Sequence, residues 1–152
     1  MTFKHNDPFT CHMTNQAQEN LSQILIEFYE KMSSWEHEVV KETGISLAQM
    51  HTIEIIGHSR DMRMKEIAQK MGITTGSLTV MIDRLEKNDL VQRLPHPDDR
   101  RSYRVALTPK GRRYHEEHHH LHLALTREIT STFSEQEIGQ LLALMEKLME
   151  GF

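Results

Sequence analysis

The sequence is poor in cysteine, in aromatic residues and in long apolar runs. One cysteine among 152 residues, Cys11, excludes a disulfide within one chain, and a reducing compartment is expected. No apolar run approaches the about 20 residues that a membrane-spanning helix needs. The first residues are polar and lack the apolar core of a signal peptide. These absences predict a cytoplasmic protein that does not bind a membrane.

Apolar residues recur at three- and four-residue intervals along most of the chain, which is typical of helices. Aromatic residues make up only 6% of the sequence and there are 10 Met residues, which favours an adaptable helical core. The length fits one domain with a substantial core. Helices are predicted over residues 14–42, 46–58, 64–71, 74–87, 108–130 and 134–149.

Residues 64–108 organise the rest of the chain. Their first two predicted helices are separated by Gly72, which tolerates the positive φ that often ends a helix. Thr74 or Thr75 then offers a hydroxyl to cap the second helix. Two helices joined by so short a turn are typical of a helix-turn-helix, which places its second helix in the major groove of DNA.

A β-hairpin is predicted directly after these helices. Residues 90–94 and 103–107 are short strand candidates, and residues 95–99 between them are turn-forming. The stretch His58 to Met62, before the module, is expected to be a loop. The predicted fold is therefore mainly α with a small β-wing, a winged helix-turn-helix flanked by dimerisation helices.

Basic charge is concentrated on this module. Between Arg84 and Arg113 there are nine Lys or Arg residues and four acidic ones, although the whole chain has a net charge of −4. An acidic protein with one basic module is suited to bind a polyanion. Small hydroxyl residues fit close to base edges, and basic residues reach phosphates. The candidate DNA-binding residues are Thr75, Ser77, Thr79, Arg84, Lys87, Arg100 and Arg101.

The helices on both sides of the module have more apolar surface than a small winged domain needs. We expect a single domain over residues 1–152, with the winged helix-turn-helix at about 46–108 and dimerisation helices at about 14–43 and 108–151. A homodimer would place two recognition helices about one DNA turn apart, which suits a palindromic operator in double-stranded DNA.

The wing carries a specific resemblance. Residues 99–111, with the sequence DRRSYRVALTPKG, resemble the MarR family of bacterial transcription regulators, and so does the order of helices over nearly the whole chain. The resemblance implies that Asp99 steadies the wing and that Arg100 or Arg101 approaches the minor groove. It also implies a DNA-binding regulator, not an enzyme, and the sequence has no HExxH motif to suggest a hydrolytic zinc site.

Histidines are the compositional anomaly of the chain. Five of the 11 histidines fall between His115 and His122. His118 and His122 are four residues apart, as are His115 and His119, so each pair shares one helix face. Two imidazoles one turn apart make half of a tetrahedral Zn²⁺ site, although such a run can also be a solvated helix face. His119 and His120 are expected to point away from the site, and His58 is expected to be a surface residue.

The histidine run also resembles the AdcR-like zinc-uptake regulators, a branch of the MarR family. The resemblance implies that zinc is the co-repressor and that the regulated genes serve zinc uptake. The matching ligands are His118, His122, His51 on the second helix and Glu38 late in the first helix, with Glu36 or His37 as alternatives to Glu38. Such ligands also suit other divalent transition metals.

Two further interpretations compete with zinc sensing. A MarR-type repressor could be released from DNA by a small aromatic or phenolic ligand bound near Trp35, Met32 and the second helix. A redox sensor acting through Cys11 is also conceivable, but nothing in the sequence around this thiol is suited to lower its pKa.

Overall fold

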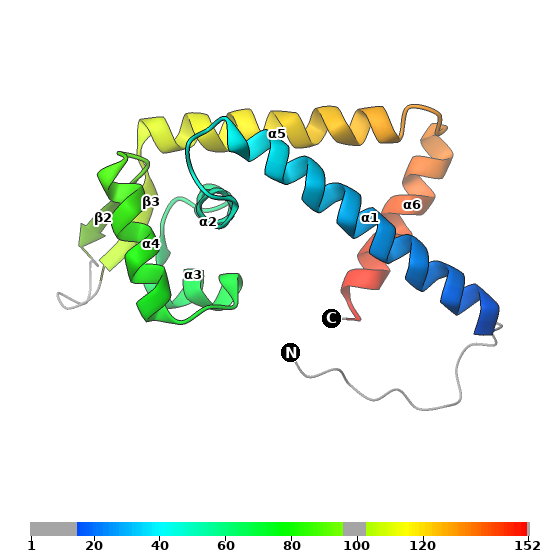
Figure 1. Ribbon diagram of the computed structural model, residues 1–152, viewed down its shortest axis with the longest axis horizontal. Helices are drawn as coiled ribbons and strands as arrows, with labels where there is room; N and C mark the ends of the chain where they lie inside the picture. Colours follow the sequence, from blue (N-terminus) through cyan, green and yellow to red (C-terminus); the bar gives the residue numbers. More distant parts are fainter. Residues whose placement is uncertain (1–14, 96–102, 152) are drawn as a thin grey trace. The chain divides into compact units, whose positions relative to one another are not determined.

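The computed structural model describes residues 15–95 and 103–151. It is mainly helical with one small antiparallel sheet, which confirms the predicted fold class (Figure 1). None of the helices within these residues is long and apolar enough to cross a membrane. The elements are α1 (Asn15–Lys41), α2 (Leu47–Gly57), β1 (Met62–Arg63), α3 (Met64–Met71), α4 (Thr75–Lys87), β2 (Val91–Pro95), β3 (Tyr103–Leu107), α5 (Pro109–Ile129) and α6 (Glu135–Met149).

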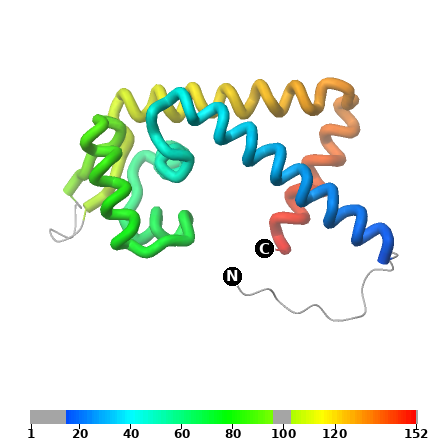
Figure 2. The backbone as a smooth tube through the Cα atoms, viewed as in Figure 1, coloured from blue at the N-terminus to red at the C-terminus, as the bar shows by residue number. Residues whose placement is uncertain are grey.

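The chain divides into two compact units. One contains the described part of Met1–Tyr29 together with that of His122–Phe152, which covers the first half of α1, the end of α5, and α6. The other, Glu30–Leu121, contains the end of α1, the elements α2 to β3, and the start of α5. In Figure 2 the second unit includes the continuous green path from α3 through a tight turn into α4.

The turn between α3 and α4 has the predicted chemistry. Gly72 ends α3 in the left-handed region, with φ of 65°, where a side chain would be strained. Thr74, one of the two predicted capping residues, caps α4, because its Oγ1 accepts a hydrogen bond from the Ser77 backbone N–H at 3.2 Å. The two helices of the helix-turn-helix therefore begin and end close to where the sequence predicts.

The sheet has three strands in the order β1-β3-β2, one more than the sequence predicts. The expectation of a loop up to Met62 is wrong at its end, because Met62 pairs with Val105 in β1. A two-residue strand has no periodicity of its own, so only its distant partner β3 reveals it. The first wing strand also begins one residue later than predicted, because the Leu90 N–H bonds to the Leu85 carbonyl and so continues the turn after α4.

A hydrophobic core lies inside the Glu30–Leu121 unit. The buried faces of α2, α3, α4 and the sheet meet there, and most of their central side chains are fully enclosed. Burial of this kind is the main stabilising term for a small unit and holds the exposed face of α4 in a fixed orientation. Its members are Ile53, Ile56, Met62, Ile67, Ala68, Leu78, Ile82, Leu85, Leu90, Val91, Val105 and Leu107.

The other unit exposes much of its apolar surface. No residue of α6 is buried, although its apolar side chains follow a helical spacing. Exposed apolar surface of this extent usually marks an interface. The large exposed apolar residues of this unit include Leu21, Ile24, Leu25, Phe28, Ile129, Ile138, Leu141, Leu142, Leu144, Met145, Leu148 and Met149.

Candidate functional site

The outward face of α4 carries the residues predicted to read DNA. Leu78, Ile82 and Leu85 anchor the helix in the core, and the opposite face is left to solvent. The predicted helix residues Thr75, Ser77, Thr79, Arg84 and Lys87 are all exposed. The Thr79 hydroxyl donates to the Thr75 carbonyl at 2.8 Å, so its oxygen remains available as an acceptor.

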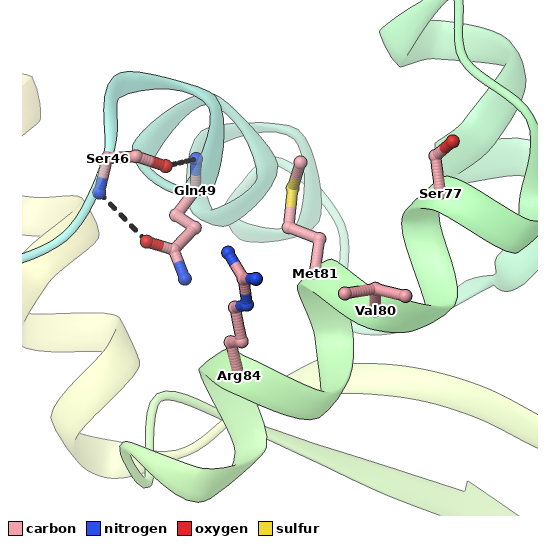
Figure 3. A pocket seen from close by; sticks show the side chains of 6 residues that line it. All are labelled: Ser46, Gln49, Ser77, Val80, Met81 and Arg84. Atoms are coloured by element: carbon pink, nitrogen blue, oxygen red, sulfur yellow. Dashed lines mark hydrogen bonds between the residues drawn. The ribbon is translucent and has the colours of Figure 1, made fainter.

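A small pocket lies beside this face, between α4 and the first turn of α2. Figure 3 shows Arg84 and Met81 projecting from α4 toward Gln49. Gln49 closes a capping box with Ser46, which fixes the first turn of α2. The Arg84 guanidinium is thus placed next to a helix N-terminus, where backbone N–H groups and basic charge together favour an anion such as a phosphate.

Two arginines of the wing strands have a structural role that the sequence did not reveal. Arg93 of β2 donates hydrogen bonds to Asp83 and Glu86 of α4, and the Asp83 bond is the main cause of its raised pKa. Arg104 of β3 pairs with Asp61 in front of β1. Sequence analysis counted these arginines only as part of the basic charge, because spacing does not identify partners on other elements.

Asp99, Arg100 and Arg101, for which the sequence predicts roles in the wing, lie outside the described residues, and so does Cys11.

Side chains from α1, α2 and α5 together form a histidine–carboxylate group. The His51 Nε2 lies 3.2 Å from a carboxylate oxygen of Glu36, which joins α2 to the end of α1. Glu36, His118 and His122 each offer a ligand atom, and these atoms lie within 4.8 Å of one another. His118 is only 2% exposed, so this part of the histidine run is not a solvated helix face. Three of the four predicted ligands, His51, His118 and His122, therefore all lie close to Glu36.

The remaining predicted ligand, Glu38, lies outside this group. Its side chain is 74% exposed and pairs with Lys41 at 3.7 Å on the solvent side of α1. His37 is also exposed, and its Nδ1 donates to the Ser33 carbonyl at 2.7 Å. Of the three alternatives on the first helix, Glu36 is thus the one that the structure brings to the histidines, because it faces α2 and α5.

A second histidine–carboxylate group was not foreseen. Glu54, His58 and His115 offer ligand atoms within 4.8 Å of one another. The sequence contained two partial signals, because Glu54 precedes His58 by one helical turn and His115 precedes His119 by another. Their convergence depends on the approach of α5 to α2, which spacing does not predict.

Near both groups an open pocket of about 280 Å³ is lined by His51, Glu54, Ile55, Lys70 and Met71. Its lining combines the apolar side chains of Ile55 and Met71 with a carboxylate and an ammonium group. Trp35 and Met32, expected beside an aromatic ligand, are half-buried on α1.

The fold and this surface are those of a DNA-binding transcription regulator. The sequence profile of the MarR family matches residues 45–103. The uncharacterized HTH-type transcriptional regulator YsmB of Bacillus subtilis is 31% identical over 102 residues, which cover 67% of this chain and 70% of the relative. The chain therefore belongs to the MarR family, whose members are transcription regulators and not enzymes.

Solved structures agree with this assignment. FabT of Streptococcus pneumoniae in complex with DNA superposes with a TM-score of 0.77 and 27% identity, over 88% of this chain and 97% of FabT. Wild-type MarR of E. coli in its apo form has a TM-score of 0.70 and 28% identity, over 84% of this chain and 95% of that chain.

Proposed function

We propose that this chain is a zinc-responsive, homodimeric repressor of metal-uptake genes, of the AdcR-like kind. The observation that carries this proposal is the convergence of Glu36, His118 and His122, with His51 bonded to Glu36. One carboxylate and three imidazoles are the side chains that suit a four-coordinate Zn²⁺ site. We propose Glu36 in place of Glu38 as the carboxylate ligand.

The burial of the group favours a bound cation over a solvated histidine face. His118 is enclosed, and the Glu36 side chain is half-buried next to it. A buried carboxylate is costly unless it is paired or coordinates a metal. Zinc would bind the Glu36 carboxylate and would accept electron pairs from neutral imidazoles.

We propose that the effect of zinc binding is transmitted to the DNA-binding helix α4 through the start of α5. The Thr108 hydroxyl donates to the Asp89 carbonyl at 2.6 Å and accepts from the Gly111 N–H at 3.0 Å, so it ties the end of α4 to the first turn of α5. Glu36 and His51 would hold the end of α1 and α2 to this same α5. An effector shifts DNA affinity only by binding one conformation more tightly. We propose that zinc favours the conformation that binds DNA.

The DNA contacts are proposed for the exposed face of α4 and for the wing. FabT, the relative solved in complex with DNA, covers most of this chain at 27% identity, which supports the same docking here. The hydroxyl residues near the start of α4 would contact base edges, while the basic residues would contact phosphates. These residues are Thr75, Ser77, Thr79, Arg84 and Lys87 of α4, together with Arg100 and Arg101 of the wing.

A second copy of this chain is the proposed partner of the exposed apolar residues on α1 and α6. Two copies related by a two-fold axis would cover these faces and read a palindrome. Leu142 is 59% exposed, so Leu142→Glu is expected to shift the protein from dimer to monomer in sedimentation equilibrium. Gln140→Glu, also exposed on α6, is the matched control and should stay dimeric.

The zinc site is tested by elemental analysis and zinc titration of the untagged chain. We expect about one tight zinc per subunit, the stoichiometry of one four-ligand site. His51→Ala and Glu36→Gln should each weaken this tight binding by at least about 100-fold, because losing a direct ligand costs more than losing a residue that only hydrogen-bonds to one. His120→Ala, on the exposed side of the same histidine run, should leave it unchanged. Tight zinc binding that survives both ligand substitutions would exclude this site.

A further inference from the structure

The second histidine–carboxylate group lies at the C-terminal end of α2, apart from the proposed zinc ligands. Glu54 projects from the last turns of α2, His58 is the residue that ends this helix, and His115 faces them from α5. The rings of His58 and His115 meet edge to face, with centroids 5.5 Å apart. All three residues belong to the same compact unit, so their convergence is a property of that unit.

Two atoms of this group are buried without a hydrogen-bond partner among the described residues. These atoms are Glu54 Oε1 and His115 Nε2. The other oxygen, Glu54 Oε2, lies 3.8 Å from His115 Nε2, which is too far for a hydrogen bond. Both side chains are only 18% exposed. Because folded proteins rarely bury polar atoms unpaired, these two atoms point to a group that binds between them.

The electrostatics of Glu54 and His115 indicate that this bound group carries a positive charge. Burial, and then the nearby Glu36 carboxylate, raise the pKa of Glu54 from its ordinary value of 4.5 to about 7. Burial, and then the charges of His58 and His119, lower the pKa of His115. The carboxylate thus lacks a cation, and the imidazole is held in the neutral form that binds metals.

We propose that Glu54, His58 and His115 bind a second divalent cation of the zinc class, at a site separate from the proposed co-repressor site. Two imidazole nitrogens and one carboxylate oxygen supply three ligands, and water completes a tetrahedron. Carboxylate and imidazole ligands without a thiolate suit Zn²⁺, Co²⁺ and Ni²⁺.

An open pocket of about 450 Å³ gives the ion and its water access to this second site. Gly57 and His115 form part of the pocket wall, so the pocket reaches His115, one of the three ligands. Because one ligand position is left to water and His58 is exposed, we expect weaker binding here than at the four-ligand group. The second ion would hold the end of α2 to α5, one helical turn from the contact that His51 makes with Glu36.

Gly57 allows a test that deletes no ligand. A Cβ added at Gly57 would lie 2.2 Å from His115 Cδ2, so an alanine there must displace the imidazole from its present position. Gly57 does not have a positive φ, and alanine is the better helix former, so the fold should tolerate the change. Gly57→Ala therefore moves a ligand without deleting it, while His58→Ala removes an exposed ligand.

The experiment is a zinc titration of the metal-stripped, untagged full chain against a chelating indicator. We expect a tight event and a weaker one, and His58→Ala and Gly57→Ala should each lower the weaker affinity by at least about tenfold while the tight event stays. His120→Ala should change neither event. A weaker event that is unchanged in both His58→Ala and Gly57→Ala would overturn the second site.

Failure of the first site can be recognised separately. His51→Ala should remove the tight event and leave the weaker one, because His51 does not belong to the second group. If His51→Ala changes nothing, the proposed co-repressor site fails, and His58→Ala still decides the second site. Cobalt gives an independent readout in the His51→Ala chain, whose first site is disabled. Co²⁺ bound there to Glu54, His58, His115 and water should show tetrahedral absorption bands, and adding His58→Ala should abolish them.

Discussion

His51 Nε2 lies 3.2 Å from a carboxylate oxygen of Glu36, although the two residues are 15 positions apart in the chain. Glu36 also lies within ligand distance of His118 and His122, so it connects α2 with α5. This carboxylate is the point on which the proposed effector response depends.

Glu54→Gln should make the metal-free protein more stable at neutral and alkaline pH. The pKa of Glu54 rises from its ordinary value of 4.5 to about 7 in the folded protein. Between pH 4.5 and about 7, the folded state therefore keeps a proton that the unfolded state has lost. The wild-type chain therefore loses stability as pH rises from 4.5 to about 7, and glutamine removes this loss. We expect a gain of about 2–3 kcal/mol near pH 8 and little difference near pH 4.

The measurement is urea unfolding of both chains across this pH range with a chelator present. Saturating zinc should reverse the order at pH 8, because glutamine is a poor zinc ligand and the wild-type chain gains the binding free energy. An equal effect of Glu54→Gln at both ends of the pH range would contradict the burial of an ionisable carboxylate.

Gly111→Ala should destabilise the junction between the wing and α5. A Cβ at Gly111 would lie 1.9 Å from the Leu90 carbonyl oxygen, a backbone atom that also accepts the Thr108 N–H. Neither backbone can yield without breaking this junction, so we expect a loss of about 1–3 kcal/mol or more in thermal unfolding. Gly76→Ala is the control, because its Cβ would meet nothing closer than 3.8 Å. Equal stability of the two variants would contradict this packing.

Arg93→Gln should loosen the wing without removing a DNA contact. Arg93 bonds to both Asp83 and Glu86, but these acids are 58% and 39% exposed, so solvent screens the pairs. We expect a loss of about 1 kcal/mol in urea unfolding, and less at high salt. Gln92→Ala, on the same strand and exposed, should be nearly neutral. A loss that does not depend on salt would indicate a packing role instead.

Arg84→Ala should weaken binding to specific and non-specific DNA alike. Its guanidinium is exposed on α4 and is proposed to contact a phosphate. Losing one such contact should reduce the slope of log affinity against log salt by about 1. Fluorescence anisotropy at several salt concentrations measures this slope. Lys147→Ala on α6 removes the same charge away from α4 and should leave the slope unchanged.

Local patterns predicted most of the fold. Helix periodicity and the glycine at position 72 predicted the helices, and the composition of residues 103–107 predicted the return strand. What sequence analysis missed depends on partners that are distant along the chain. β1 exists only through β3, and the Arg93 bonds exist only because β2 lies beside α4.

The metal ligands, too, were predicted where local spacing identifies them and missed where distant partners decide. Helical spacing identified the pair His118 and His122, and the resemblance supplied His51. Spacing did not decide between Glu36 and Glu38, because that choice depends on which face of α1 turns toward α2. The group of Glu54, His58 and His115 was missed for the same reason, since two helices must approach each other to form it.

Zinc held by Glu36 and the histidines is proposed to control DNA binding. The most direct measurement is the affinity of the untagged chain for its own promoter region at buffered zinc concentrations, compared with His51→Ala. We expect the affinity to rise on zinc addition, to fall with a chelator, and not to respond to zinc in His51→Ala. DNA affinity that is unchanged by both zinc and the chelator would rule out zinc as the effector and would favour release by a small aromatic ligand.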